Sequence, residues 1–190
     1  VEGSIDISVM REVARLSNFK EGPLLAKEYL ENLGIHLIVE SHLPKTYLDG
    51  VALLLKNTPI IGLTLRHDRT DNFWFCLLHE LAHVSKHLSD SDGVIVDDLD
   101  LRNEESDQEN LIEKEADEMT RDGLIPNEIW NNNPLGQNPS YVDILPFAAK
   151  LKINPAIVVG RVRFEQKDYR ILSRYVGSNE VRKLFWAKPN

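Results

Sequence analysis

The chain has 190 residues, of which 42% are hydrophobic and 27% are charged, and its formal net charge is −8. This length and apolar content suit one globular domain, or one domain with a small appendage, and argue against disorder over the whole chain. No apolar run approaches the roughly 18 residues of a membrane span, and no signal peptide is recognisable, so no membrane association is expected. The single cysteine, Cys76, excludes a disulfide framework and favours a reducing, cytoplasmic compartment.

The acidic residues are unevenly distributed along the chain. Residues 90–118 contain thirteen acids against two bases, Arg102 and Lys114, a balance of −11 that leaves about +3 for the rest. A run of this kind is typical of a solvated loop, and the alternative is a rim that favours basic substrates. The first residue is Val1 rather than Met, which suggests a processed product or a fragment of a longer protein.

The first third of the chain predicts helices followed by strands. Apolar residues recur at helical spacing in two segments, and Pro23 suits the first turn of the second. An alternating segment and two Val, Ile and Leu-rich runs joined by a Pro-containing turn then predict a strand and a hairpin. The expected helices are 8–17 and 22–33, and the expected strands are 35–40, 51–56 and 60–65.

The remainder predicts mostly helices. Residues 89–108 are expected to form a long acidic loop between two of them, and Gly123 is expected to end the second. A later pair of helices, joined by residues 152–154, resembles a helix-turn-helix. Its second member offers only Pro, Ala, Ile, Val and Gly over 155–160, so packing on the core is favoured over DNA binding. The expected helices are 71–88, 109–122, 144–151 and 155–162, with a further helix or two in the tail.

The segment 73–84 contains the motif His-Glu-x-x-His, formed by His79, Glu80 and His83. On a helix, residues four apart lie on one face, so both imidazoles can bind one Zn²⁺ ion. Glu80 follows the first ligand and can act as the general base that activates a water molecule. The spacing therefore predicts a metal site on this helix, with Cys76 as a small buried side chain behind it.

A third ligand is expected from the helix 109–122. Glu113 and Asp117 are four residues apart, so Glu113 can bind the metal while Asp117 accepts a hydrogen bond from a ligand histidine. Glu115 is the alternative third ligand, because helical phase alone does not separate it from Glu113. His87 lies eight residues from His79, too far along the axis to share its ion, and is expected at the surface.

Together, His79-Glu80-Leu81-Ala82-His83, Glu113-Lys114-Glu115-Ala116-Asp117 and Leu124-Ile125-Pro126 resemble the ImmA/IrrE family of zinc metallopeptidase domains. The resemblance covers roughly residues 24–165, and the two helix motifs are its specific part. It implies an α+β fold, a mostly helical zincin-like domain over 1–126 with a small antiparallel sheet beside the metal helix. A helical C-terminal subdomain over 127–190 would pack on it.

The resemblance also implies a function and a partner. The expected activity is an intracellular zinc endopeptidase that cleaves a regulatory protein, such as a helix-turn-helix repressor or an antitoxin-like regulator. The alternative is a regulatory or sensor domain with little or no proteolysis, which would meet DNA only through a fused or partner domain. The oxyanion stabiliser is left open among Tyr47, His67 and Tyr141, with Arg66 also considered, although residues 66–69 are more simply a solvated connector. The oligomeric state is not predicted.

Overall fold

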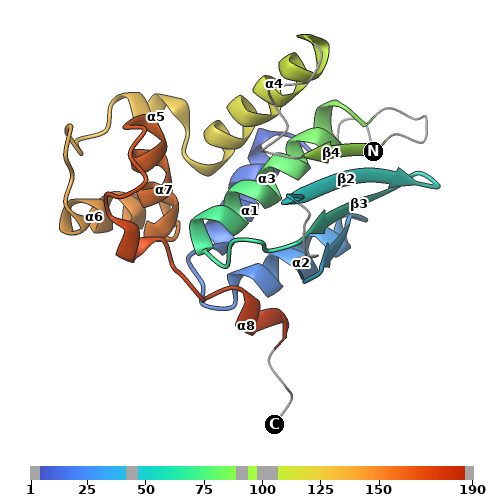
Figure 1. Ribbon diagram of the computed structural model, residues 1–190, viewed down its shortest axis with the longest axis horizontal. Helices are drawn as coiled ribbons and strands as arrows, with labels where there is room; N and C mark the ends of the chain where they lie inside the picture. Colours follow the sequence, from blue (N-terminus) through green and yellow to red (C-terminus); the bar gives the residue numbers. More distant parts are fainter. Residues whose placement is uncertain (1–4, 42–46, 89–93, 98–106, 187–190) are drawn as a thin grey trace.

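The computed structural model describes residues 5–41, 47–88, 94–97 and 107–186, with side chains described except in 94–97 and 107–110. The predicted α+β class is confirmed: helices pack beside one small sheet, which lies at one side of the molecule (Figure 1). Within the described ranges, no helix combines the length and apolar character that crossing a membrane requires.

The chain begins with the two predicted helices, α1 (Ile7–Leu16) and α2 (Gly22–Asn32). The Asp6 carboxylate starts α1, because it accepts the backbone N–H groups of Ser8 and Val9 at 2.9 and 3.1 Å, which the first turn would otherwise leave unpaired. Pro23 lies in the first turn of α2, where no N–H is needed. Both helices pack into the core through buried apolar residues.

The sheet has the order β1-β3-β2-β4. Its strands are β1 (His36–Val39), β2 (Gly50–Leu55), β3 (Thr58–Leu63) and β4 (Val94–Asp97). The predicted hairpin β2–β3 forms, but the Pro-containing turn predicted for it is wrong, because Pro59 lies within β3. Lys56 and Asn57 make the two-residue turn instead, with φ values of 49° and 62°. Positive φ at both positions matches the right-handed twist of the flanking strands.

Two features of the sheet differ from the prediction. The sheet is mixed rather than antiparallel, because β1 pairs in parallel with β3. The strand that follows β1 in sequence is β2, and β3 runs back beside β1 after the hairpin has reversed the chain. The second difference is β4, which lies in the predicted loop 89–108 and pairs with β2. Four residues are too few to show a strand period among acidic neighbours.

The central element is α3 (Thr70–Lys86), which carries the His-Glu-x-x-His motif. Figure 1 shows it with the sheet on one side and the later helices on the other. It contacts α1, α4, α7, β2 and β3, and it is buried on nearly all sides along residues 73–84. A helix that is apolar all round must lie inside the domain, which explains why its two histidines are interior residues. Cys76 is buried as predicted.

The next helix, α4 (Asp107–Leu124), does not end at Gly123 as predicted. A Cβ atom at this position would lie 3.1 Å from Met10 Cβ and 3.2 Å from Leu78 Cδ2. Gly123 therefore permits close packing of α4 against α1 and α3, which is a different use of glycine from ending a helix.

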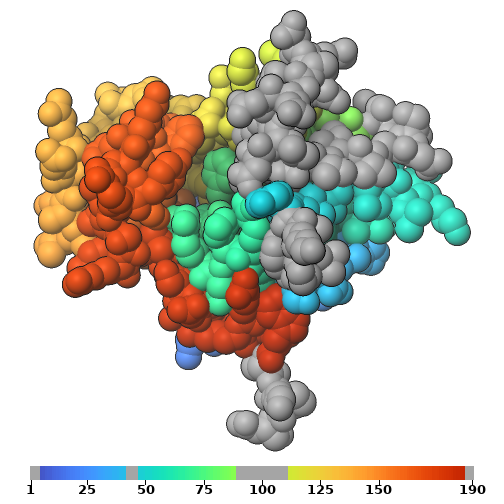
Figure 2. Space-filling view, in the orientation of Figure 1, coloured from blue at the N-terminus to red at the C-terminus, as the bar shows by residue number. Residues whose placement is uncertain are grey.

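The C-terminal part adds a helical layer to the same core. It contains α5 (Asn127–Asn131), α6 (Tyr141–Leu151), α7 (Pro155–Glu165), a 3-10 turn η1 (Ser173–Tyr175) and α8 (Arg182–Phe185). As predicted, α7 packs on the core: it lies against α3, and its Ile157, Val158 and Val159 side chains are buried. In Figure 2 the orange surface of this region adjoins the green surface of α3. The expected division at residue 126 stays a prediction.

Candidate metal centre

The two histidines of the motif lie one turn apart on the buried side of α3. Both His79 and His83 are fully buried, with 0% of each residue exposed. Their Nε2 atoms are 3.0 Å apart. Buried polar atoms this close together need a shared proton or a cation between them, because burial without a partner costs free energy.

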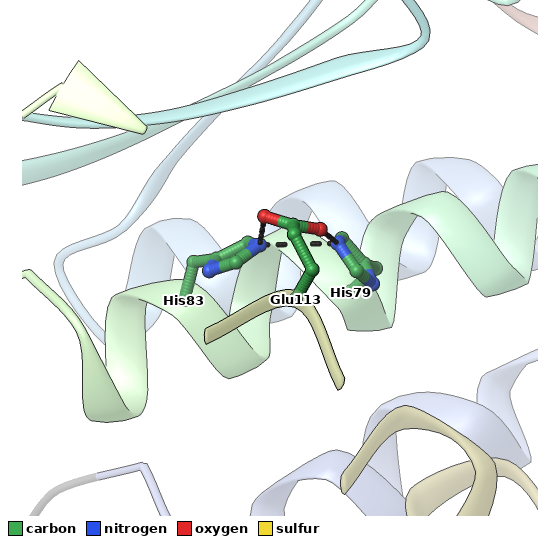
Figure 3. A group of neighbouring side chains, drawn as sticks. All are labelled: His79, His83 and Glu113. Carbon is green, nitrogen blue, oxygen red and sulfur yellow. Dashed lines mark hydrogen bonds and ion pairs between the residues drawn. The ribbon is translucent and has the colours of Figure 1, made fainter. Parts of the chain in front are cut away.

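Helix α4 brings Glu113 to these two nitrogens (Figure 3). Glu113 Oε2 lies 3.0 Å from His79 Nε2, and Glu113 Oε1 lies 3.2 Å from His83 Nε2. Each carboxylate oxygen thus faces one imidazole. The structure therefore brings together the three residues that the sequence predicts as metal ligands. They come from two packed helices, and Glu113 follows His83 by thirty residues in sequence.

The arrangement of donor atoms fits a small metal ion. One ligand atom from each of His79, His83 and Glu113 lies within 4.8 Å of the others. Donors about 2.0–2.1 Å from a tetrahedral ion are themselves roughly 3.3 Å apart, close to the separations seen here. Two imidazoles and one carboxylate are a donor set that zinc accepts, and three protein ligands leave a fourth position for water or substrate.

The protonation of the group also suits a cation. Burial lowers the pKa of the His83 imidazole, and the neighbouring His79 acts in the same direction, against the opposing effect of Glu113. Burial alone would raise the pKa of the Glu113 carboxyl, but hydrogen bonds with His79 and His83 outweigh it and hold that pKa well below its usual value. A neutral imidazole and an ionised carboxylate are the forms that bind metals.

Asp117 contacts His79 at the ring nitrogen that does not face Glu113. Its Oδ1 atom lies 3.2 Å from His79 Nδ1, and its Oδ2 atom lies 3.5 Å from Arg121 Nη1. The contact has the distance of an ion pair but not the geometry of a hydrogen bond. It places a negative charge next to Nδ1, which favours the proton on that nitrogen and leaves Nε2 to face Glu113. The sequence predicts this role for Asp117, one helical turn after Glu113.

Substituting Asp117 with Asn tests this role. The amide can present its NH₂ group to His79 Nδ1 and carries no charge, so the imidazole loses its anchor and part of its basicity. We expect the affinity for zinc to fall by about 10–100-fold, as is usual for such supporting residues. Competition with a zinc-binding dye measures it. Glu118→Gln, at an exposed position of the same helix, is the matched control. An unchanged affinity in Asp117→Asn would contradict the role.

His83 has a comparable support that the sequence reasoning missed. His83 Nδ1 lies 3.1 Å from His87 Nδ1, and His87 Nε2 lies 3.2 Å from Glu115 Oε2. The prediction of a surface histidine is thus wrong, since only 9% of the His87 side chain is exposed. Its distance from His79 excludes a shared ion but not a contact with His83, four residues away. The spacing of four residues between His83 and His87 is the sequence signal that could have predicted this contact.

These contacts favour a proton on the Nδ1 atom of each imidazole. With the Nδ1 proton of His79 next to Asp117 and that of His83 directed to His87, both Nε2 atoms would present lone pairs to a metal ion, which would replace their hydrogen bonds to Glu113. Such a convergence of electron pairs in a buried site is unfavourable without a cation. Glu115, the alternative third ligand, contacts His87 instead, and 59% of its side chain is exposed.

Glu80 projects from α3 toward the sheet. It is fully buried, and a Cβ atom on Gly50 of β2 would lie only 2.2 Å from its Oε1 atom. The absence of a side chain at position 50 thus makes room for this carboxylate between α3 and β2. Glu80 directly follows the predicted ligand His79 in sequence.

The candidate oxyanion residues have contacts elsewhere. The Tyr141 ring stacks on Tyr175 with centroids 3.9 Å apart, and the Arg66 guanidinium lies over the Tyr47 ring at 5.6 Å. His67 is exposed, and burial of part of its ring, together with Arg66 and Arg69, lowers its pKa. The role therefore stays unassigned among these residues.

The connector 66–69 is exposed or partly exposed to solvent, and it is also held by hydrogen bonds. Arg66 donates to the Asp49 carboxylate at 3.2 and 3.0 Å. The Asp68 carboxylate accepts the backbone N–H groups of Val181 and Arg182, each at 3.0 Å. These contacts join the start of α3 to the C-terminal segment and fix the helix that carries the histidines.

Comparison with known proteins adds no identification. Neither a scan against models of protein families nor a search of curated proteins gave a match to this chain. Its function is therefore inferred from the geometry of the site.

Proposed function

We propose that this chain is a zinc-dependent endopeptidase that hydrolyses a peptide bond in a regulatory protein. The observation that carries the proposal is the buried convergence of His79, His83 and Glu113, with donor atoms 3.0–3.2 Å apart. A purely structural zinc site is closed by four protein ligands, whereas the residues that the structure describes supply three. A fourth position open to substrate is what catalysis requires.

Each residue has a role in this chemistry. Zinc, when bound, polarises the scissile carbonyl and lowers the pKa of coordinated water toward about 7. Glu80 takes the proton from the attacking water and passes it to the leaving amine. Asp117 and His87 hold the imidazoles in the tautomer that binds metal. The Glu113 carboxylate balances part of the ion's charge.

The sheet offers a place for the peptide backbone. Among the described strands, β4 lies at the end of the sheet next to β2, and β2 packs against α3. An edge strand has free backbone N–H and C=O groups, which can pair with an extended peptide. Such a peptide would lie along the sheet beside the metal-bearing helix. The resemblance to the ImmA/IrrE family supports a helix-turn-helix repressor or an antitoxin-like protein as the natural substrate.

The direct test combines metal content with cleavage. The purified protein should bind one zinc ion per chain, measured by mass spectrometry of the metal, and should cleave members of a random-sequence peptide library or candidate repressors. Removal of zinc by a chelator should stop cleavage, and added zinc should restore it. Stoichiometric zinc without cleavage of any peptide or candidate repressor would favour the regulatory alternative.

Gly50→Ala tests the placement of Glu80 without touching a metal ligand. The new methyl group would overlap the Glu80 carboxylate and displace it. Misplacement by about 1 Å can cost roughly 100-fold in rate, so we expect a drop of this order in kcat/KM with unchanged zinc affinity.

The control for this variant is Gly62→Ala on the neighbouring strand β3. Its added methyl group would meet Val51 Cγ1 at 2.9 Å and leaves Glu80 in place. Equal losses of activity in the two variants would point to damage of the sheet and contradict a specific effect on Glu80.

A further inference from the structure

A charged cavity, separate from the group of candidate metal ligands, lies between α3, α4 and α7, on the side of His79 that faces Asp117. Its volume is about 300 Å³, which is at the small end of the range for ligand sites. Part of its wall is apolar, formed by Phe75, Leu124, Ile157 and Phe164. Figure 2 shows the surface hollowed where the orange, yellow and green segments meet.

The charges around this cavity are unbalanced. Four arginines line it but only two carboxylates, those of Asp71 and Asp117; the arginines are Arg69, Arg121, Arg161 and Arg163. Arg161 also pairs with Glu165, outside the wall, at 2.8 Å, which leaves four positive charges against three negative ones. Asp71 is already bound by Arg69, at 2.8 and 2.9 Å. Asp117 is shared between Arg121 and His79. Since arginine stays protonated in proteins, the excess of positive charge is permanent.

Arg163 is buried and Arg161 is partly buried, with 12% of its side chain exposed, and both keep donors available. Among the described residues, Arg161 Nη1 and Arg163 Nε have no hydrogen-bond partner, although they are shielded from solvent. Arg163 is 5% exposed, and its Nη1 atom lies 3.5 Å from Asp71. Burial lowers the pKa of both guanidinium groups, and nearby arginines add to the effect. A negative charge within the cavity would relieve this repulsion.

We propose that this cavity binds a small organic anion, with a carboxylate or phosphate group attached to an apolar or aromatic body. The planar guanidinium groups of Arg161 and Arg163 match the oxygens of such a group. The rings of Phe75 and Phe164 would cover its apolar body. A cationic ligand is excluded by the four arginines, and the volume suits a molecule the size of a monocyclic aromatic acid.

The site is distinct from the metal ligands but adjoins them. Asp117 lines the cavity and also contacts His79, while the Phe75 ring is stacked on the His79 ring at a centroid distance of 5.9 Å. The three metal ligands themselves are not among the residues of its wall. Binding of the anion therefore does not depend on the metal or on peptidase activity, and it can be measured with zinc removed.

Titration calorimetry of the whole zinc-free protein tests the proposal, with phenyl phosphate and benzoate as probes. We expect one molecule of at least one probe to bind per chain, about tenfold or more tighter than inorganic phosphate. Phenol, which has the ring but no charge, should not bind detectably. Failure of both probes to bind at millimolar concentration, or equal binding of phenol, would overturn the proposal.

Variants then locate the site. Arg161→Gln and Arg121→Gln should each weaken probe binding by about tenfold or more, since hydrogen bonds to charged groups contribute strongly. Arg15→Gln is the matched control, because Arg15 lies on α1, pairs with Glu12 and is half exposed outside the cavity. If Arg161→Gln does not fold, Arg121→Gln decides, since 19% of the Arg121 side chain is exposed. Equal binding by the folded cavity variants and Arg15→Gln would place the anion elsewhere.

Discussion

Glu80→Gln should abolish peptide hydrolysis while one zinc ion still binds. The variant keeps the size of the side chain but removes the basic oxygen that accepts the proton of the attacking water. General acid–base catalysis typically contributes about 10²–10⁴-fold, and we expect a loss toward the upper end because the same residue serves both proton transfers. Because Glu80 is not a ligand, the affinity for zinc should change little.

The measurement compares initial rates on one cleavable peptide with the zinc content of the same preparation. Glu118→Gln carries the same chemical change at an exposed position of α4 and should retain wild-type activity. Cleavage by Glu80→Gln at more than about a tenth of the wild-type rate would remove Glu80 from the catalytic role, since acid–base catalysis contributes at least about 10²-fold. Loss of zinc together with activity would instead assign Glu80 a part in holding the metal.

The sequence predicts which residues meet at the candidate metal centre because each helix contributes them at a fixed local spacing. The spacing of four between His79 and His83 is fixed by the helix, as is that between Glu113 and Asp117. Two such pairs on packed helices need only the correct rotation to meet. The sequence pattern does not give that rotation, so the prediction favours Glu113 through its pairing with Asp117 but leaves Glu115 as an alternative.

The errors in the fold have the opposite origin, since they concern pairing between distant segments. The parallel pairing of β1 with β3 depends on the path that the chain takes between strands, and no local pattern of residues encodes that path. Strand β4 is too short for periodicity to reveal it, and it forms by pairing with β2. Gly123 looks like a helix stop in sequence, because its use is revealed only by the closeness of α1 and α3.

The contact between His83 and His87 shows a third limit of prediction from sequence. As a ligand for the ion, His87 is excluded by its distance from His79 along the helix. A histidine one turn beyond a ligand can instead accept the ligand's Nδ1 proton, and Glu115 then holds that histidine. The same acidic residue that competes with Glu113 in sequence thus acts one step further from the metal.

Glu113→Gln and Glu115→Gln separate these two acidic residues. Glu113→Gln removes the negative charge that faces both imidazoles, so we expect zinc affinity to fall at least about 100-fold, beyond the usual loss at a supporting residue. Glu115→Gln alters only a contact to His87 that is largely exposed, so its loss should stay within about tenfold. The two substitutions remove the same charge from the same helix, which makes each the control for the other.

Zinc affinity is measured by dye competition, and the rise in melting temperature on adding zinc gives an independent reading. A ligand that binds only the folded state stabilises it in proportion to the logarithm of its concentration over Kd, so Glu113→Gln should lose most of the rise and Glu115→Gln should keep it. An equal loss in both variants would mean that α4 is rotated relative to α3, and the three-ligand site would then be wrong. If Glu113→Gln keeps full affinity for zinc, the Glu113 carboxylate does not bind the metal. The inference that a coordination position is left open for hydrolysis would then fail as well.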